Sequence, residues 1–389
     1  MAVTGALGTT QVLSDQLAID LGDMIHSLEP TAAPLTQFST RADKRKTVAT
    51  KFWWLEDNTK QRFNATNASV TNVATSFAVV AGQGGNYSPL DLVLNTRTGE
   101  VFRVVSIATD TLTVVRGVGA GGTGVAMNAS DELYTIGTAS TEGDVSRASR
   151  NDNPAKVTNN TQIFRNPFDV TGSLDASGFQ VSPAEWPRQA KLKGIEHAKD
   201  IELSFLFGKK DAYNVAISSG TYEQRTTGGV LSFITTNQTD AGGDLSEAEF
   251  NAFMLQVNRF PATQRSKLAL ASGVAVSALN KFPASKQMTK NDETTYGMNV
   301  TNYVSPFGSL NLVWHPMLEG TKYSGYLIVV DMDQVAYRYL GNDQVSRDTK
   351  VLPNRQQPDA DAKKSEYLTE CGLEFGLQKM HGVLTGITS

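Results

Sequence analysis

Apolar and polar side chains alternate along much of the segment 76–137, and this period of two predicts β-strands rather than helices. The expected strands are residues 77–80, 90–94, 101–107, 112–116 and 133–136, with short turns at 96–99 and 108–110. Five short strands predict a small barrel or sandwich with a core of its own. Alternation assigns to its core face Leu90, Leu92, Leu94, Val101, Val105, Ile107, Leu112 and Val114.

A helical period replaces the alternation between Pro187 and Phe207. At 1.5 Å per residue this helix would be about 30 Å long. Ser182, Pro183 and Glu185 form a helix-start signature, and Gly208 is expected to end the helix. The flank expected to pack consists of Ala190, Ile195, Ala198, Glu202, Phe205 and Leu206.

The remaining pattern predicts a mixture of helices and strands. One short helix is expected over residues 246–258, and a second begins at the capping residue Ser272 and runs to residue 281. Residues 350–364 are interpreted as a polar linker that contains proline. Strands are expected at residues 162–170, 267–271, 310–314, 326–330, 335–340 and 366–387.

The segments on either side of the predicted barrel are extended and polar. Residues 138–160 are rich in Asn, Asp, Ser, Arg and Gly, and the alternating pattern resumes at Gln162. A long two-stranded limb is marginal by itself, and its edges need another surface to cover them. The sequence therefore predicts self-association.

The N-terminal segment differs in charge from the segment after it. Apolar residues recur at helical spacing between Val12 and Leu28, opposite Asp15 and Asp23, and the predicted helix ends before Pro30. Pro30 and Pro34 are expected to break the chain. Residues 1–40 contain no Lys or Arg, whereas residues 41–62 are basic. Two interpretations stay open: a helix packed on its own domain, or an arm that lies on a neighbouring subunit.

The basic segment 41–62 includes Phe52, Trp53 and Trp54. Basic residues beside aromatic ones are the composition that stacks single-stranded nucleic acid. We favour the other interpretation, in which the aromatic side chains anchor the segment in a core or interface and the charges meet solvent or acidic neighbours.

Composition is that of a globular protein. The 389 residues are 40% hydrophobic and 19% charged, which predicts two or three structural units with ample core. The formal charge of −4 does not argue for nucleic-acid binding across the whole surface. The one cysteine, Cys371, excludes an intrachain disulfide and is expected at a half-buried strand position. Neither a signal peptide nor a membrane span is recognised, so folding in the cytoplasm is expected.

Gly117, Gly119 and Gly122 follow a predicted strand with the spacing GxGxxG of dinucleotide-binding sites. Such a site needs a helix directly after the glycines, because the helix N-terminus receives the pyrophosphate. The residues that come after them predict another strand, ending at Leu133–Ile136. We therefore interpret the motif as a glycine-rich loop that closes a hairpin of the barrel, not as a cofactor site.

No other pattern indicates catalysis or metal binding. His26, His197, His315 and His381 are scattered, and none has the spacing of a metal-ligand motif. Asp331 and Asp333 lack the later ligands of a calcium loop and predict a turn at a strand end. No catalytic, cofactor-binding or metal-ligating residue is assigned, and no cofactor is expected.

Several local patterns, taken in their order, resemble the major capsid proteins of tailed bacteriophages with the Hong Kong 97 (Johnson) fold, in the podophage major-head family. The segments that carry the resemblance are Asp23–Leu35, Lys51–Asp57, Arg188–Phe207 with Glu-His-Ala-Lys-Asp-Ile-Glu at its centre, and Val329–Leu340. The resemblance covers nearly the full chain. It implies an α+β capsid fold in which a small β-barrel-like domain is inserted in the extended loop.

The resemblance also implies a domain order. Residues 1–60 would be the N-terminal arm, 61–181 the extended loop with the inserted β domain at about 76–137, 182–229 the peripheral domain with its spine helix, 230–350 the axial domain, and 351–389 strands that return to the peripheral domain.

The function implied is assembly rather than catalysis. Hexamers and pentamers of the chain would form the icosahedral head shell of a virion, assembled in the cytoplasm of the bacterial host. The implied partners are further copies of the chain, portal and scaffolding or decoration proteins, and packaged double-stranded DNA through non-specific proximity, with no membrane. Alternatives are a tail or adhesin-type structural β protein and an NAD-linked enzyme.

Overall fold

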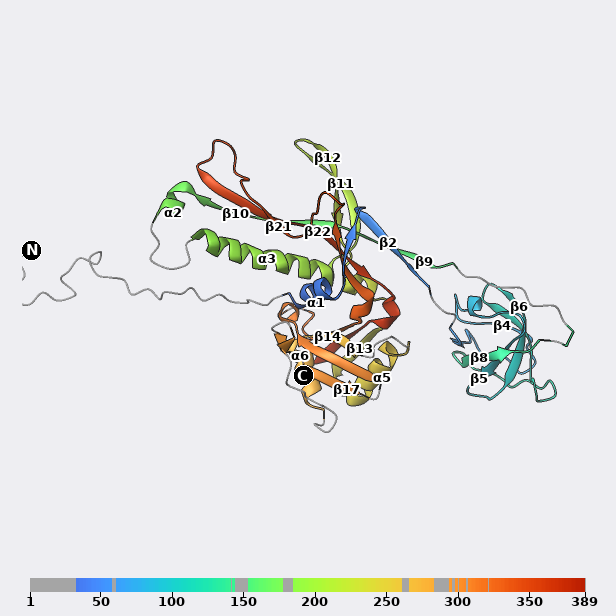
Figure 1. Ribbon diagram of the computed structural model, residues 1–389. Coiled ribbons are helices and arrows are strands. Elements are labelled where there is room, and N and C mark those ends of the chain that lie inside the picture. The colour runs from blue at the N-terminus through green and yellow to red at the C-terminus, as the bar shows by residue number, and fades with distance from the viewer. Residues whose placement is uncertain are drawn as a thin grey trace, which may run out of the picture. The chain divides into compact units, whose positions relative to one another are not determined.

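The computed structural model describes residues 33–57, 61–140, 142–143, 153–177, 185–260, 266–282, 294–295, 298–299, 301–305, 307–320 and 322–388. The chain divides into two compact units. Unit 1 comprises Met1–Glu56 and Lys156–Ser389, and unit 2 comprises Asp57–Ala155 (Figure 1). No helix within the described residues is long and apolar enough to cross a membrane.

The first sheet of unit 1 has five strands, and a long helix covers one of its faces. Its central strand β22 (Ala362–Phe375) pairs antiparallel with β20 (Val335–Leu340) and with β10 (Gln162–Thr171), and β10 is an edge strand. At the opposite edge, β1 (Lys44–Thr47) pairs in parallel with β20, and β21 (Lys350–Leu352) pairs with β22 on the side away from β10. The helix α3 (Glu185–Phe207) lies along β10 and β22 (Figure 1).

The predicted long helix is confirmed as α3, and it ends at Phe207 as expected. The Gly208 N–H still donates to Ser204 O at 3.0 Å, but the chain turns away at the glycine. The predicted packing flank was only partly right, because Ala190, Ile195 and Ala198 are half-buried. The side chains that α3 buries are His197, Ile201, Glu202, Phe205 and Leu206. Ser182 and Pro183 of the start signature lie outside the described residues.

The second sheet of unit 1 is covered on both faces. Its strand order is β13 (Gln238–Asp244), β23 (Gly382–Thr388), β19 (Leu327–Val330), β14 (Ser266–Ala271), β18 (Gly308–Trp314) and β17 (Thr301–Ser305). On β14, Leu268 and Leu270 face the core shared with α3, whereas Ala269 and Ala271 face the core under α5 (Glu247–Val257) and α6 (Gly273–Asn280). Burial on both faces explains why this strand reads as a continuous apolar run.

The caps of α5 and α6 depend on local sequence. Ser246 and Glu249 form the capping box of α5, in which each side chain bonds to the other's backbone N–H. The Ser272 hydroxyl accepts from Ala275 N–H and begins α6. Both helix predictions are confirmed.

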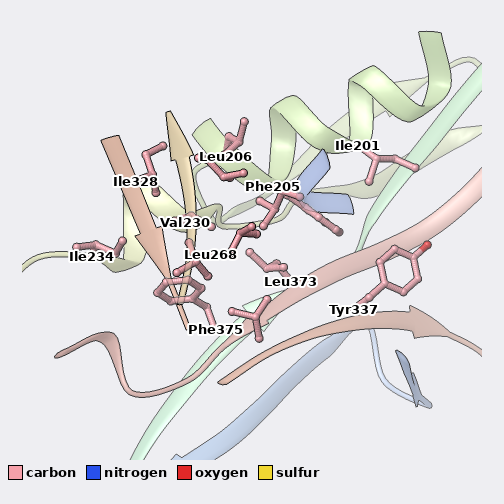
Figure 2. Close-up of a cluster of buried hydrophobic side chains, with 14 of the residues drawn as sticks. Ile201, Phe205, Leu206, Val230, Ile234, Leu268, Ile328, Tyr337, Leu373 and Phe375 are labelled. Carbon is pink, nitrogen blue, oxygen red and sulfur yellow. The ribbon is translucent and has the colours of Figure 1, made fainter. Parts of the chain in front are cut away.

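One apolar cluster joins the helix and the two sheets of unit 1. Figure 2 shows side chains from α3, β14, β19, β20 and β22 converging on this cluster. Phe205 and Leu206 of α3 are fully buried in it. Burial of a Phe or Leu side chain stabilises a fold by about 1.5–3 kcal/mol, so this cluster fixes α3 across both sheets.

Unit 1 contains further short elements. They are α1 (Pro34–Ala42), β2 (Lys51–Glu56), β9 (Ala155–Asn160), α2 (Gly172–Ala176), β11 (Asp211–Ile217), β12 (Gly220–Thr226), α4 (Val230–Phe233), β15 (Thr294–Thr295), β16 (Met298–Asn299), and the 3-10 turns η3 (Pro316–Leu318), η4 (Met332–Gln334) and η5 (Gln378–Met380). β2 pairs with β9, β11 with β12, and β15 with β16.

Unit 2 is a small closed barrel. Its strands follow the order β3 (Phe63–Ala65), β8 (Glu132–Thr138), β5 (Asp91–Asn95), β6 (Val101–Ala108), β7 (Thr111–Val115) and β4 (Ser76–Ala78), with the 3-10 turn η2 (Gly84–Asn86) beside them. A bridge between Thr66 and Val79 joins the ends of β3 and β4. The bonds Asn67 N–H to Ala78 O and Val80 N–H to Ala65 O, both 3.0 Å, complete the closure. A closed barrel leaves no open sheet edge.

The predicted core face of the barrel was wrong on β5 and at Val105 of β6, whereas Ile107 of β6 packs against the core as predicted. Val93 of β5 and Phe102 and Val104 of β6 are fully buried, whereas Leu92 and Leu94 are half-buried and Val105 is 47% exposed. The inward positions of β5 also include the polar residues Asp91 and Asn95, which bond to loops. A prediction from apolar alternation alone therefore assigned the wrong face of β5 to the core. The prediction for Leu112 and Val114 of β7 is confirmed.

Several predicted boundaries need correction. The barrel begins at β3, which lies before the expected 76–137, because β3 supplies the strand that closes it. β20, placed in the 230–350 segment, pairs with β22 of the first sheet, and β23, placed with the return strands, belongs to the second sheet. The supposed linker 350–364 contains β21 and the start of β22.

Three smaller corrections concern single features of unit 1. Pro34, expected to break the chain, begins α1, since proline is tolerated in the first turn of a helix. The hairpin β11–β12 was not predicted. Cys371 is fully buried rather than half-buried, and burial raises the pKa of its thiol to about 12. The helix predicted between Val12 and Leu28 lies outside the described residues.

Candidate assembly surfaces

Alternate side chains of β2 anchor this strand in unit 1. Phe52 and Trp54 are buried, and the Trp54 ring lies 5.9 Å from that of Phe233, measured between centroids. Trp53, on the opposite face, is 52% exposed and lies under the Lys156 ammonium of β9 at 4.8 Å. The interpretation of Phe52 and Trp54 as anchors is confirmed, and Trp53 stays available on the surface of the β2–β9 pair.

The basic run that precedes β2 meets acidic neighbours. Lys44 and Lys46 of β1 pair with Asp348 and Asp343, the second pair at 2.6 Å, and Arg45 lies 3.4 Å from Glu374. These cations are neutralised within the chain. The structure therefore favours the interpretation that this basic run is part of a sheet edge, and not a surface that binds nucleic acid.

The hairpin β11–β12 is an exposed two-stranded ribbon. It projects from the body of unit 1 (Figure 1), and its apolar side chains Tyr213, Ile217 and Tyr222 are 46%, 56% and 56% exposed. Exposed apolar side chains gathered on one element mark an interaction surface. The signal for this hairpin in the sequence is the alternation of residues 213–217 before a turn at 218–220, and it was not among the predicted strands.

Glu202 of α3 fastens α1 to unit 1. Ala33, the residue at the start of α1, offers no capping side chain. The Glu202 carboxylate instead accepts from Leu35 N–H at 2.7 Å and from Thr36 N–H and the Thr36 hydroxyl at 2.6 Å each. A carboxylate at the start of a helix also suits the helix dipole. Glu202 was expected on the packing flank of α3, and this cap is the reason for its burial.

The same carboxylate reaches the second sheet through His315, just after β18. The His315 ring bonds to Glu202 through Nε2 at 2.7 Å and accepts from Met317 N–H through Nδ1. Because Nδ1 accepts, Nε2 is the ring atom that donates to the Glu202 carboxylate. Glu202 and His315 are both fully buried. This junction connects the N-terminal part of the chain, α3 and the second sheet.

The GxGxxG glycines lie in a loop between β7 and β8, and no helix comes after them. All three have positive φ, at 62° for Gly117, 84° for Gly119 and 83° for Gly122. A Cβ at Gly117 would lie 2.4 Å from Thr123 O, so this loop requires glycine. β7 and β8 pair with other strands and not with each other, so the expectation that the loop closes a hairpin was wrong.

The amide groups of this loop bind a carboxylate of their own chain. Glu100 accepts from Gly117 N–H at 3.2 Å and from Val125 N–H at 2.9 Å. It also forms two bonds of 2.6 Å with Arg116, and both charged side chains are almost completely buried. Burial opposes ionisation of Glu100, but the bonds from Arg116 and Val125 hold its pKa below the usual value. The loop is a structural turn built around an ion pair.

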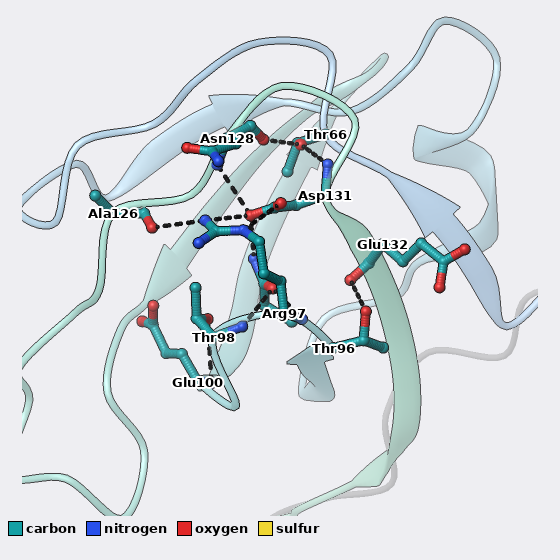
Figure 3. A network of polar contacts seen from close by, with 10 residues as sticks. Thr66, Thr96, Arg97, Thr98, Glu100, Ala126, Asn128, Asp131 and Glu132 are labelled. Carbon is teal, nitrogen blue, oxygen red and sulfur yellow. Dashed lines mark hydrogen bonds and ion pairs between the residues drawn. The ribbon is translucent and has the colours of Figure 1, made fainter.

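A second polar network closes the other turns of the barrel. Figure 3 shows Asp131 accepting from Arg97, with Nε–Oδ1 and NH2–Oδ2 distances of 2.6 and 2.7 Å. Asn95 of β5 and the Asn128 N–H bond to the same carboxylate at 3.0 and 2.9 Å. Arg97 holds the pKa of Asp131 far below its ordinary value. Asn95 is one of the polar residues on the inward face of β5, the face that the prediction had assigned to the surface.

Acid is expected to destabilise unit 2 through Asp131. Because the folded-state pKa is lowered, the contribution of the carboxylate is complete above its unfolded value of 3.8 and is lost as the pH falls through the folded pKa. Between about pH 5 and pH 2, Asp131→Asn should flatten this part of the pH dependence. Hydrogen exchange in peptides from residues 61–140, corrected for intrinsic rates, measures it. An unchanged slope in the variant would contradict the assignment.

Of the remaining sequence candidates, Asp331 and His381 meet, because the Asp331 N–H donates to His381 Nδ1 at 3.0 Å, and His197 lies apart from them. His197 bonds Asn166 and Thr369 under α3, and His381 is buried beside Phe375, where burial lowers its pKa to about 3. Asp331 accepts from Asp333 N–H at the start of η4, which confirms the predicted turn. In the described part of the chain no three His, Cys, Asp or Glu side chains gather as a metal site. His26 lies outside the described residues.

Comparison with known proteins gives consistent results. A model of the SU10 major capsid protein family matches residues 3–388. The major capsid protein of Pseudomonas phage PaMx41 is 27% identical over 292 residues, which cover 71% of this chain and 66%, just under two thirds, of that relative. The capsid of an empty GTA particle superposes over 100% of both chains with a TM-score of 0.50 and 11% identity. A structure from Mycobacterium phage Bobi covers 98% of this chain and 99% of its own, with a TM-score of 0.49 and 11% identity.

The superposition on the GTA capsid shows the fold, which is α+β and of the Hong Kong 97 type, as the resemblance implied. The family model extends across both units, including the barrel and the elements that flank it. The chain belongs to the SU10 major capsid protein family.

Proposed function

We propose that this chain is the major capsid protein of a tailed bacteriophage, whose copies form hexamers and pentamers that close into an icosahedral head shell around double-stranded DNA. The observation that carries this proposal is the family match over residues 3–388. The protein acts as a structural component of the virion, assembled in the bacterial cytoplasm, and not as an enzyme. The Gly117 and Val125 N–H groups already donate to the Glu100 carboxylate, which supports a structural role for the glycine loop rather than a cofactor site.

The exposed elements of unit 1 support self-association. The β2–β9 pair carries the exposed Trp53, and the β11–β12 hairpin carries exposed tyrosines. Association costs about 4–15 kcal/mol in lost translational and rotational freedom, so copies in a shell need wide interfaces. Exposed ribbons supply interface without requiring a larger core.

The domain assignments are part of the proposal, with boundaries adjusted to the sheets. The β2–β9 pair and the barrel serve as the extended loop with its insertion, and the first sheet with the spine helix α3 serves as the peripheral domain. The second sheet with α5 and α6 serves as the axial domain, which includes β23 but not β20. Residues before β2 form the N-terminal arm.

The proposed partners beyond the chain itself are a portal protein, scaffolding or decoration proteins, and the packaged DNA. The net charge of −4 and the internal pairing of Lys44 and Lys46 argue against a sequence-specific role in binding DNA. Contact with DNA is therefore proposed to be non-specific, through enclosure within the shell.

Negative-stain microscopy of the expressed full-length chain tests the function. Closed shells, or hexamers and pentamers, support the proposal. Tubes, trimers or fibres would instead indicate a tail or adhesin protein. Calorimetric titration with NAD provides the second test, and saturable binding that Gly119→Val abolishes would overturn the structural interpretation of the loop.

Replacing residues 61–150 by a short Gly-Ser linker is expected to abolish stable shells while unit 1 stays folded. The two cores do not depend on each other, because unit 2 encloses its own apolar cluster. Sedimentation and microscopy measure the shells, and hydrogen exchange in α3 and β14 provides the folding control. Normal shells from the shortened chain would contradict the prediction.

A further inference from the structure

The face of the first sheet that lies opposite α3 carries a basic cavity. Side chains of β10 and β22 alternate between the two faces, and Phe164 of β10 and Tyr367 of β22 contact α3. Their neighbours Arg165 and Leu368 therefore lie on the other face. The cavity on this face has a volume of about 260 Å³ and spans β10, β21 and β22.

The strand register places cations on both sides of an apolar floor. Arg165 of β10 and Lys350 of β21 each lie opposite Leu368, on its two sides. Arg347 and Arg355, from the segments that precede and follow β21, also line the cavity. The floor consists of Ile163, Leu352 and Leu368. Four cationic side chains thus surround one apolar surface.

Two buried carboxylates hold the arginines in position. Glu366 accepts from Arg165 at 2.6 and 2.9 Å, and the Arg355 guanidinium lies 3.6 Å from it. Glu370 accepts from Arg347. The Glu366 and Glu370 side chains are 9% and 3% exposed. Because these carboxylates are buried and bonded to the arginines, the guanidinium groups are oriented before any ligand binds, which lowers the entropy cost of binding.

The cavity has positive charge that the described part of the chain does not neutralise. Four cations meet two carboxylates, even when Glu370 is counted wholly against Arg347, which leaves an excess of two positive charges. The side chains of Arg165 and Arg355 are 58% and 48% exposed, so both present N–H groups to solvent. The Lys350 ammonium donates to a backbone oxygen at 3.1 Å, which uses one of its three N–H groups. The cavity therefore offers both hydrogen-bond donors and charge to an anion.

We propose that this cavity binds a phosphate group, carried by a free polyphosphate or by the backbone of a nucleic acid. The planar guanidinium group matches phosphate oxygens in a bidentate way, and several such groups around one point suit an anion with more than two acceptor oxygens. A carboxylate brings one charge and two oxygens, which is less than this cavity can bind. The apolar floor lowers the local dielectric constant and so strengthens each charge interaction.

Calorimetric titration of the unassembled full-length chain with inorganic pyrophosphate tests the proposal. We expect saturable binding with one site per chain. Lys350→Ala with Arg355→Ala should weaken this binding about tenfold or more, because two charge-assisted hydrogen bonds are lost. Lys191→Ala with Lys281→Ala removes the same charge at exposed positions of unit 1 and is the matched control. Absence of saturable binding, or equal weakening in the two double variants, would overturn the proposal.

Hydrogen exchange of the unmodified chain locates the site without a substitution. Pyrophosphate should slow exchange in peptides from residues 345–355 and leave peptides from α5 unchanged, because α5 packs on the second sheet. The same measurement without pyrophosphate provides the folding control, since the Lys350 and Arg355 double variant should keep the protection of α3. Slower exchange elsewhere, with none in residues 345–355, would refute the assigned location.

Competition distinguishes the two carriers of the phosphate group. A short single-stranded DNA oligonucleotide that displaces pyrophosphate, and that binds the double variant more weakly, would assign the site to a nucleic-acid backbone. Displacement by inorganic triphosphate but not by the oligonucleotide would assign it to a free polyphosphate. If neither displaces pyrophosphate, the cavity does not recognise the phosphate group and the proposal fails.

This inference goes beyond the proposed function and does not depend on it, because binding is measured before assembly. If the unmodified chain forms shells but binds no pyrophosphate, the cavity inference fails and the capsid function stands. If the chain binds pyrophosphate at this site but forms no shells, the site stands and the proposed function fails.

Discussion

Replacing Glu202 by alanine is expected to lower the free energy of unfolding of unit 1 by about 3–5 kcal/mol, because each buried donor left without an acceptor costs about 1–3 kcal/mol. The substitution leaves the Leu35 and Thr36 N–H groups at the start of α1 without an acceptor. It also removes the acceptor of the buried His315 proton. Unsatisfied buried donors are costly because water cannot replace the lost partner.

Denaturant unfolding of the unassembled chain measures this effect. Glu196→Ala is the matched control on the same helix, because its carboxylate is 52% exposed and pairs with Lys193 near the surface. The control should change stability by less than about 1 kcal/mol. Equal effects of the two substitutions would show that the junction contributes no more than a surface ion pair.

Glu202→Ala should also release α1 before unit 1 unfolds. Hydrogen exchange in residues 34–42 should rise more than exchange in β14, because the carboxylate is the principal anchor of the helix start while β14 is buried on both faces. If the N-terminal segment reaches a neighbour, a released α1 would also weaken assembly. Unchanged exchange in α1 would contradict the assigned role of the cap.

Replacing Glu100 by alanine is expected to destabilise unit 2 by about 3–5 kcal/mol and to leave unit 1 almost unchanged. The Arg116 guanidinium would be left buried without its carboxylate, with side-chain exposure of 4%. The N–H groups of Gly117 and Val125 would lose their acceptor too. The glycine loop should therefore become mobile together with the barrel end that it covers.

Hydrogen exchange resolved by peptide distinguishes the two units in this experiment. Peptides from residues 61–140 should lose protection, and peptides from α3 should keep it, because the units have separate cores. Glu132→Ala, at an exposed position of β8, is the matched control. Loss of protection in both units would show that they unfold together.

Several helices and strands could be predicted from the sequence because their ends depend on local interactions. The α3 boundary at Gly208, the capping box of Ser246 and Glu249, and the cap at Ser272 each depend on residues a few positions apart. The alternation on β7 has the same origin, since successive side chains of a strand point to opposite faces. These interactions are complete within one element, so the sequence carries them in full.

Features that depend on distant partners were missed or misplaced. The register of β5 depends on Asn95, whose bond to Asp131 favours an inward polar side chain over a leucine. The start of α1 depends on Glu202, which is remote in the sequence. The cavity lined by Ile163, Lys350 and Leu368 likewise requires β10, β21 and β22 to meet, and no window of the sequence contains all three.

The sequence by itself determined the long helix, the separate β unit, the absence of a helix after the glycines, and the similarity to tailed-phage capsid proteins. Only the tertiary structure decided which strands share a sheet, how the barrel closes, and which carboxylates are buried against which donors. The physical reason is the sequence separation between the interacting residues. Periodicity and capping act over a few residues, whereas strand pairing and burial depend on chain segments that meet only after folding.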